Sequence, residues 1–223
     1  GLDMVAINWN STGKRSYEAG LDRVVLYTQT SDPVPWFGFR SYEESISGGE
    51  AEPYYIDGIK YLNIPSPEDY KASISSVGYP QEFRECDGSR QLAAGLIVTQ
   101  QERRPFSLSY RTQVGSDTRP LGTTYRLHLV YNLLASPSNR SHATLQKDPS
   151  METNKWSVTS KPIPYPGVKP ISHLIIDSSA VAVASRLTTV ERYLYGTSTI
   201  TPRLLDPGQI VAILSGETVD FED

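Results

Sequence analysis

The sequence predicts a mostly β protein, an antiparallel β-sandwich or barrel with one flanking α-helix. Polar and apolar residues alternate along 106–114 (FSLSYRTQV) and along 124–132 (TYRLHLVYN), with turn residues between the two stretches. Such alternation is typical of strands and favours a long hairpin. Other short stretches are rich in β-branched and aromatic residues. Only one segment, 180–195, has a helical spacing of apolar residues.

The remaining elements follow in chain order. We expect the helix to carry Val183, Leu187, Val190 and Leu194 on one face. Residues 177–179 are expected to cap its start, and Gly196 is expected to end it. Further strands are expected at 22–29, 54–62, 70–78, 95–101, 155–163 and 172–178.

Three segments are expected to lie outside regular elements. Residues 41–53 (SYEESISGGEAEP) are polar and acidic, which predicts a long exposed loop. Residues 161–170 contain four prolines and should form a stiff connection. An N-terminal arm is expected over about residues 1–20. With 38% hydrophobic residues among 223, the chain can bury a core, and we expect a single domain over 1–223.

The bulk charge argues against a surface built to hold nucleic acid. The chain has 25 acidic and 21 basic residues, a formal charge of -4, whereas nucleic-acid binding relies on phosphate neutralisation by cations. One cysteine cannot form an internal disulfide, as is typical of proteins matured in a reducing compartment. No stretch approaches the ~20 apolar residues that span a membrane. Synthesis in the cytoplasm without a membrane partner is therefore expected.

No catalytic, cofactor-binding or metal-binding residue is predicted, and the chain is not expected to be an enzyme. His128, His142 and His173 are far apart in the sequence and lack close metal-ligand spacing. The sequence contains neither a GxSxG nucleophile motif nor a GxGxxG motif that opens a helix after a strand. Two carboxylates of the acidic segment 41–53 would suffice for a glycosidase, but a solvated loop face is the commoner meaning of such a cluster.

Cys86 lies between two carboxylates, in the segment YPQEFRECDGS (79–89). A nucleophilic cysteine needs nearby cations that favour its thiolate, whereas Glu85 and Asp87 oppose ionisation. We therefore expect Cys86 to be a small buried structural residue, with Asp87-Gly88 forming a turn.

Several blocks, in order along the chain, carry a family resemblance. They are RSYEAGLDRVVLY (15–27), EPYYIDGIKYLN (52–63), YPQEFRECDGS (79–89), QQERRPFSLSYRTQVG (100–115), YRLHLVYNLLASPS (125–138) and KPISHLIIDS (169–178). Together they resemble the major tail protein, the tail tube subunit, of long-tailed bacteriophages that infect Gram-positive bacteria. The resemblance covers most of the chain. It does not include the C-terminal immunoglobulin-like domain of some family members, which is expected to be absent here.

The resemblance implies the phage tail tube fold and a structural role in the virion tail. Six copies would close into a ring, and stacked rings would conduct DNA from the capsid to the host without binding it specifically. The implied partners are further copies of the chain, the tape measure protein, and the tail tip and tail terminator proteins. The candidates for contact between rings lie in the arm and the acidic segment: Trp9, Glu43, Glu44, Glu50, Glu52, Tyr54 and Tyr55.

If the solvent-exposed face of the predicted hairpin lined the channel, the polar side chains of that face would contact the DNA. We expect the channel to be neutral or acidic on balance, because each phosphate contact adds affinity that would hinder sliding. The candidates for this lining are Ser107, Ser109, Arg111, Gln113, Arg126 and His128, together with Asn132.

Two other function classes remain open on the sequence. A carbohydrate-binding β-sandwich could use some of the 14 tyrosines and three tryptophans as sugar-stacking surfaces, although core and interface packing explain the same aromatics. A hydrolase would need two carboxylates facing each other in one cleft.

Overall fold

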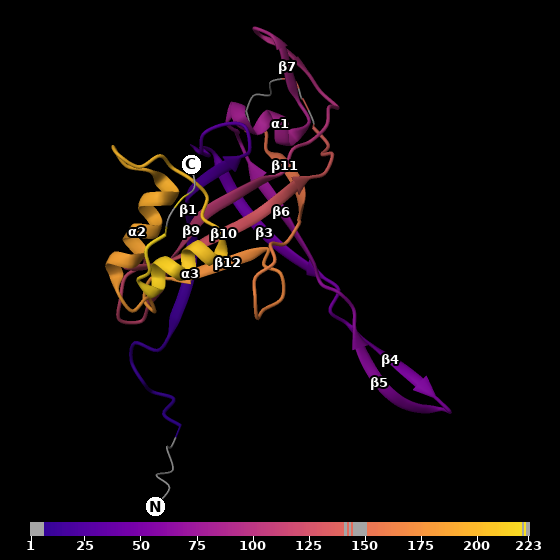
Figure 1. Cartoon of the computed structure of the whole chain (residues 1–223), viewed down its shortest axis with the longest axis vertical. Coiled ribbons are helices and arrows are strands. Elements are labelled where there is room, and N and C mark those ends of the chain that lie inside the picture. The colour runs from indigo at the N-terminus through magenta and orange to yellow at the C-terminus, as the bar shows by residue number, and fades with distance from the viewer. Residues whose placement is uncertain (1–6, 141, 143, 145–150, 220, 222–223) are drawn as a thin grey trace, which may run out of the picture.

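The structure is a computed structural model that describes residues 7–140, 142, 144, 151–219 and 221. Its main element is a curled antiparallel sheet in the order β2-β1-β9-β10-β11-β6-β3, with β12 pairing with the first half of β10 (Figure 1). The mostly β class is therefore confirmed. The strands of this sheet are β1 (Ser16–Thr28), β2 (Val34–Pro35), β3 (Phe39–Ser47), β6 (Asp69–Ser76), β9 (Phe106–Ser116), β10 (Thr124–Ala135), β11 (Asn154–Ser160) and β12 (His173–Asp177).

The predicted hairpin of β9 and β10 lies at the centre of this sheet, and both of its faces are buried. The register pairs Tyr110 with His128 and Arg111 with Leu127. Residues directly opposite each other share a face, so Tyr110 of β9 lies on one side of the sheet, whereas Leu127 and Leu129 of β10 lie on the other. Each side has its own hydrophobic cluster.

The first cluster fills the inside of the curl and is rich in aromatic rings. Phe83 lies 4.6 Å from Trp36 and 5.1 Å from Trp156, measured between ring centroids. Phe83 ends the short helix η1 (Gln81–Phe83), which leads directly into α1 (Arg84–Asp87). In α1, Asp87 is buried, accepts a hydrogen bond of 2.7 Å from Nε1 of Trp156 and pairs with Arg140. A buried charge is stable only when it is paired in this way.

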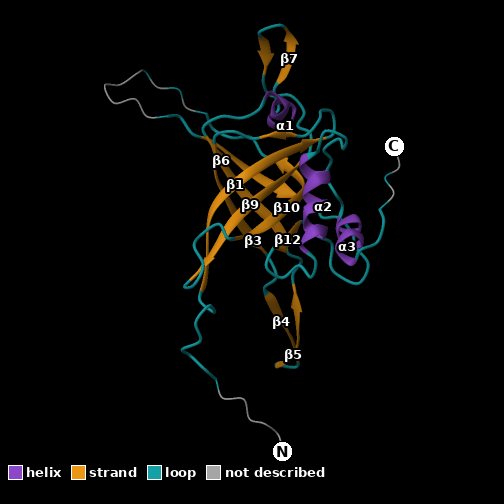
Figure 2. Cartoon of the chain, turned by 90° about the vertical axis from the view of Figure 1, so that its left-hand side faces the viewer, coloured by secondary structure: helices purple, strands orange, loops and turns teal. Residues whose placement is uncertain are grey.

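The second cluster joins the outer face of the sheet to the helices α2 (Ala184–Tyr195) and α3 (Pro207–Ser215), and Figure 2 shows both helices beside the sheet. The buried residues of α2 are Leu187, Val190 and Leu194, three of the four that the sequence predicts for its apolar face, whereas Val183 is exposed and precedes the helix. Gly196 ends α2 as expected, but residues 177–179 do not cap it. Asp177 instead accepts a 2.9 Å hydrogen bond from the backbone N–H of Ser179.

Helix α3 is absent from the sequence-based prediction, although its start carries a recognisable signal. Asp206 accepts a hydrogen bond of 2.8 Å from the N–H of Gln209, whose side chain accepts one of 3.0 Å from the N–H of Asp206. Pro207 occupies the first turn, and Gly216 ends the helix. A capping box with a proline just inside it is a start signal for a short helix.

Two expectations about residues 41–62 are wrong. Most of the expected loop 41–53 belongs to strands β3 and β4, and the expected strand 54–62 is divided between β4 (Ala51–Ile56) and β5 (Ile59–Pro65). Asp57 and Gly58 separate these two strands and have φ angles of 51° and 74°. Two consecutive residues with positive φ form the tight turn of a hairpin. The polar residues of segment 41–53 lie on an edge strand and on a projecting hairpin. Strands in these positions are open to solvent, so a polar sequence there does not require a loop.

The other expected strands are present with shifted ends, and the short hairpin of β7 (Arg90–Ala93) and β8 (Leu96–Val98) takes the place of a strand at 95–101. Strand β1 begins at Ser16, so residues 16–20 of the expected arm belong to the sheet.

The surroundings of Asp87 predict that its substitution destabilises the protein more than substitution of the nearby carboxylate Glu85. Asp87→Asn removes the buried charge that faces Arg140 and should lower the free energy of unfolding by about 2 kcal/mol. The matched control is Glu85→Gln, because Glu85 is half-exposed in its ion pair with Arg104; this change should cost less than about 1 kcal/mol. Urea unfolding followed by tryptophan fluorescence measures both, and equal losses would contradict this role for Asp87.

Candidate assembly surfaces

The hairpin of β4 and β5 projects away from the sheet and exposes apolar side chains. Figures 1 and 2 both show it extending beyond one end of the body. Tyr54, Tyr55, Ile56 and Ile59 are each more than half exposed. Contiguous exposed apolar residues are characteristic of a surface that another molecule covers. With six residues in β4, the hairpin reaches about 20 Å at ~3.3 Å per residue.

Two glycines mark the base of this projecting hairpin. Gly48 and Gly49 have φ angles of 89° and 77°, and a Cβ added to Gly48 would lie 2.2 Å from the carbonyl oxygen of Pro67. On the opposite side of the base, the N–H of Ser66 donates a 3.0 Å hydrogen bond to the carbonyl of Glu50. Only glycine fits such a close approach with positive φ, so the direction of the hairpin depends on these two residues.

The seven candidates for contact between rings occupy different places. Trp9 is 82% exposed in the arm before β1, and Tyr54 and Tyr55 are exposed on β4. Glu43 and Glu50 are exposed, on β3 and at the hairpin base. The candidates Glu44 and Glu52 differ: Glu44 binds His173 within the chain, whereas the side chain of Glu52 lies outside the described part of the structure.

The sheet leaves two strand edges without a neighbour among the described residues. Strand β3 ends the sheet order on one side, and on the other side β2 pairs with β1 only at Val25 and Leu26. The first part of β1, from Ser16 onwards, therefore has β9 on one side only. Unpaired strand edges present backbone N–H and C=O groups that can pair with another chain.

The expectation that the polar residues of the central hairpin share one solvent-exposed face is wrong, because the pairing register places Arg111 of β9 on a different face from Arg126 and His128 of β10. Arg126 and His128 lie opposite Thr112 and Tyr110, whereas Arg111 lies opposite Leu127 on the other face. Three candidates for the channel lining are buried within the chain: Ser107, Ser109 and His128. Asn132 is at a bulge, where its N–H donates to the hydroxyl of Ser107 at 3.0 Å.

The cationic candidates for the channel lining are already paired with carboxylates. Nε of Arg111 lies 3.1 Å from Oδ1 of Asp22, and its guanidinium lies 4.5 Å above the ring of Tyr125. Asp22 also accepts a hydrogen bond of 3.1 Å from the side chain of Gln113. The pKa of the Asp22 carboxyl is lowered although its burial opposes this, because Arg111 and Gln113 donate to it.

Arg126 is paired in the same way on the opposite face. It pairs with Glu18, and its Nε lies 3.4 Å from Oδ2 of Asp177. Little cationic charge of Arg111 and Arg126 is therefore left for a phosphate.

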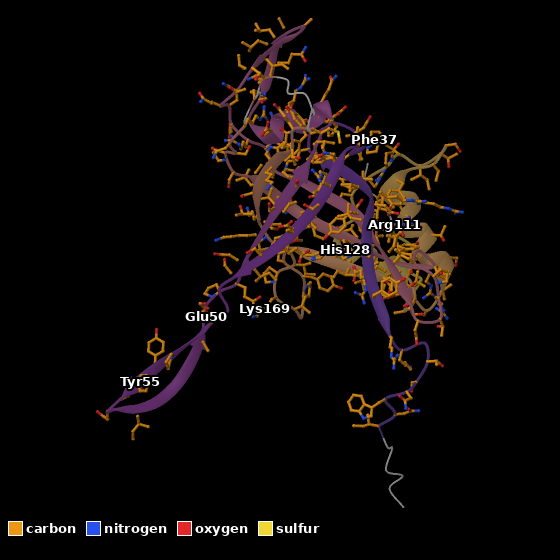
Figure 3. The ribbon with its side chains drawn as sticks, turned by 180° about the vertical axis from the view of Figure 1, so that it is seen from behind. Phe37, Glu50, Tyr55, Arg111, His128 and Lys169 are labelled. Atoms are coloured by element: carbon orange, nitrogen blue, oxygen red, sulfur yellow. The ribbon has the colours of Figure 1, made fainter. Side chains whose placement is uncertain are left out.

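A chain of polar side chains crosses the interior from β3 to β1. Oε1 of Glu44 lies 2.8 Å from Nδ1 of His173, and Nε2 of His173 lies 3.0 Å from Nδ1 of His128. Nε2 of His128 lies 2.8 Å from the hydroxyl of Thr112, which binds Glu18. We call these five residues the polar relay. The relay links β3 to β1 through side chains. Figure 3 shows His128, its central residue, within the body of the molecule.

The relay keeps its central histidine neutral at physiological pH. Burial, and then the charge of His173, lower the pKa of His128 from 6.5 to about 4, although Glu18 and Glu44 oppose this shift. Burial opposes ionisation of Glu18 and Glu44, but hydrogen bonds from Thr112 and Arg126 to Glu18, and from His173 and Tyr70 to Glu44, outweigh it and lower both pKa values.

Cys86 is buried, as the sequence predicts, and Gly88 follows with a φ of 79°. Burial, and then the charge of Glu85, raise the pKa of its thiol to about 12, with Arg104 opposing. Among the described residues, no group of three or more His, Cys, Asp and Glu side chains is arranged to hold a metal ion. No helix in this part of the chain is long and apolar enough to cross a membrane.

The low pKa of His128 predicts that acid destabilises the fold. The unfolded state binds the proton of His128 more readily than the folded state does. The contribution of neutral His128 to the free energy of unfolding is therefore complete above pH 6.5 and is lost as the pH falls toward 4. Glu18 and Glu44 act in the same direction, but only as the pH falls through their usual value of 4.5. We expect a fall of about 2 kcal/mol in unfolding free energy between pH 7 and pH 5.

Urea unfolding across this pH range measures the effect. His128→Gln should reduce the slope between pH 6.5 and pH 5, whereas His142→Gln, at an exposed histidine, should keep it. An unchanged slope in His128→Gln would contradict the assignment.

The burial of Cys86 predicts slow thiol chemistry. At neutral pH the native protein should react with a thiol reagent at least about 100-fold more slowly than the urea-unfolded protein, because the thiolate is rare and covered. Absorbance after addition of an aromatic disulfide reagent measures both rates, and similar rates would show that Cys86 is accessible.

Comparisons with known proteins give likenesses only among solved structures. A scan against models of protein families finds no match, and a search of curated proteins finds none. The tube-terminating cap of the anti-feeding prophage is 14% identical with a TM-score of 0.40, over 78% of this chain and 96% of that chain. The sheath/tube terminator of the extracellular contractile injection system PVC, in its extended state, is 13% identical with a TM-score of 0.31, over 77% and 99%.

The sheath–tube complex of the same injection system is 11% identical with a TM-score of 0.32, over 70% of this chain and 88% of that chain. At TM-scores this low, none of these likenesses bears on function.

Proposed function

We propose that this chain is a structural subunit of a bacteriophage tail tube, in which six copies close into a ring and rings stack into a hollow tube. The observation that carries the proposal is the β4–β5 hairpin, whose exposed tyrosines and isoleucines extend beyond the body of their own chain. A monomer gains nothing from exposing these side chains to water. A head-to-tail contact between copies would bury them, and such contacts generate filaments.

The unpaired strand edges support lateral closure. A subunit offers β3 at one side of its sheet and the first part of β1 at the other. If β3 of one copy approached β1 of the next, the ring would remove both edges, as barrel closure does within one chain. Exposed polar residues on β3, such as Glu43, discourage irregular edge pairing while leaving the backbone free to pair.

The electrostatics support passage of DNA without specific binding. The chain carries a net charge of -4, and Arg111 and Arg126 are held by Asp22, Glu18 and Asp177. Each phosphate contact by a free cation would add salt-dependent affinity, which a conduit must avoid. In this role the chain acts without a cofactor, and its partners are other copies of itself, the tape measure protein, and the tail tip and tail terminator proteins.

Removal of the projecting hairpin tests the proposal. Joining residue 50 to residue 66 through a two-residue turn is compatible with the 3.0 Å backbone hydrogen bond between Ser66 and Glu50. The truncated protein should keep its melting temperature within about 3 °C, because the described side chains of the hairpin belong to neither hydrophobic cluster. It should still form rings, but not stacked tubes. Negative-stain electron microscopy and mass measurement over a concentration series report the outcome.

A matched surface control separates assembly from general surface damage. Tyr55→Ser on the hairpin and Val168→Ser on the body replace side chains that are 63% and 58% exposed. Only the first should impair stacking. Tubes of normal length from the truncated chain would contradict the role of the hairpin. A full-length chain that stays monomeric with added tail tip and tape measure proteins would contradict the tube proposal as a whole.

A further inference from the structure

An apolar groove lies beside the β1–β2 connection, far from the projecting hairpin. Its volume is about 580 Å³, and its walls include Pro33, Pro35, Trp36 and Phe37 on one side and Tyr195 on the other. Phe37 stands at its rim and is 80% exposed. A second hollow of about 290 Å³ continues it past Pro33 and Pro202, which line both. An elongated segment with apolar side chains would fit this shape.

The charge of the groove is positive, and that of the hairpin is negative. The residues that line the two hollows include Arg23 and Arg203 but no aspartate or glutamate. Arg23 is exposed, at a bulge of β1 where its φ is 51°. By sequence, residues 50–66 of the hairpin contain three acids and one lysine, and Asp57 is at the exposed tip. Complementary charge selects the partner and orients it.

The groove and the hairpin lie toward opposite ends of the molecule. Figure 3 places Phe37 near one end of the body, whereas Glu50 and Tyr55 lie at and beyond the other end. Copies that stack in the same orientation therefore bring the hairpin of one toward the groove of the next. This heterologous contact does not close on itself and can continue along an axis.

We propose that the groove beside β1 and β2 is the receptor for the β4–β5 hairpin of a second copy, with Tyr54 and Tyr55 against the prolines and Phe37, and Asp57 near Arg23. This inference rests on the proposed stacking of copies and identifies the surface that receives the hairpin. The aromatic and proline walls supply apolar contact area, and the positive charge of Arg23 favours the acidic tip.

The N-terminal arm is a competing occupant, because Trp9 is also exposed and the arm leaves the same end of the body as the hairpin (Figures 1 and 2). Residues 7–15, however, carry Lys14 and Arg15 and no acid. Their charge has the same sign as that of Arg23, so the groove favours the hairpin over the arm.

Disulfide trapping between two single-site variants tests the pairing. Tyr55→Cys and a tagged Phe37→Cys chain are mixed, assembled and oxidised, and the mixed dimer is measured on a non-reducing gel while the same sample is imaged. Cys86 is buried and supplies little background. Bond formation requires Cα atoms within about 7 Å. The mixture of Tyr55→Cys with Phe37→Cys should give at least about 10-fold more mixed dimer than the mixture of Tyr55→Cys with Val168→Cys. A difference of this size indicates a clear preference of the hairpin for the groove.

Each outcome of this mixture is informative. Tubes in which Tyr55→Cys links to Val168→Cys instead would overturn the receptor but keep the tube proposal. Efficient linkage of Trp9→Cys to Phe37→Cys, in place of the hairpin, would show that the arm occupies the groove. Samples without rings or tubes at any concentration, and without any mixed dimer, would overturn the inference and the proposed function together.

A double-mutant cycle tests the charge pair separately. Arg23→Gln and Asp57→Asn each should raise the concentration needed for tubes by about 5-fold, the upper end of the range for an exposed charge pair. The double variant should be no worse than either single variant, because the two residues act on one contact. Asparagine tolerates the positive φ of position 57. Strictly multiplicative effects would show that Arg23 and Asp57 do not meet; Arg119→Gln, at an exposed turn, is the control.

Discussion

The antiparallel pairing of β9 with β10 is the contact on which the rest of the structure depends. Its register places Tyr110 of β9 on one face and Leu127 and Leu129 of β10 on the other, so a single hairpin must be covered on both sides. The curl of the sheet covers one face with the aromatic cluster around Phe83, and α2 with α3 covers the other. Exposing either face would leave leucines and tyrosines in water, which explains why helices and sheet are both needed.

Burial on both faces also decides the chemistry of the polar residues between them. Groups that enter the interior must find partners there, and Glu44, His173, His128, Thr112 and Glu18 do so in one continuous chain. This chain joins β3 to β1, the strands that carry the unpaired edges. The position of one edge is thereby linked to that of the other.

Exposed apolar surface is concentrated on extensions of the body. The described side chains of the β4–β5 hairpin belong to neither cluster, and two glycines at its base set its direction. Such an extension can be altered without loss of the core. The groove beside β2 has the complementary composition at the other end of the chain. In the proposed assembly, the contacts between copies would thus use residues other than those of the core.

Local patterns in the sequence determined the mostly β class, the central hairpin, the apolar face of α2 and the burial of Cys86, because each depends on neighbours within a few residues. The alternation in β9 and in β10 did not reveal which residues share a face, since a shift of one residue in register moves every side chain to the opposite side. The tertiary structure alone decided that Arg111 and Arg126 lie on different faces and that Ser107, Ser109 and His128 are buried. It also decided that the acidic segment extends as strands, because the edge position of β3 and the turn at Asp57 and Gly58 are set by pairing with distant β6 and with β5.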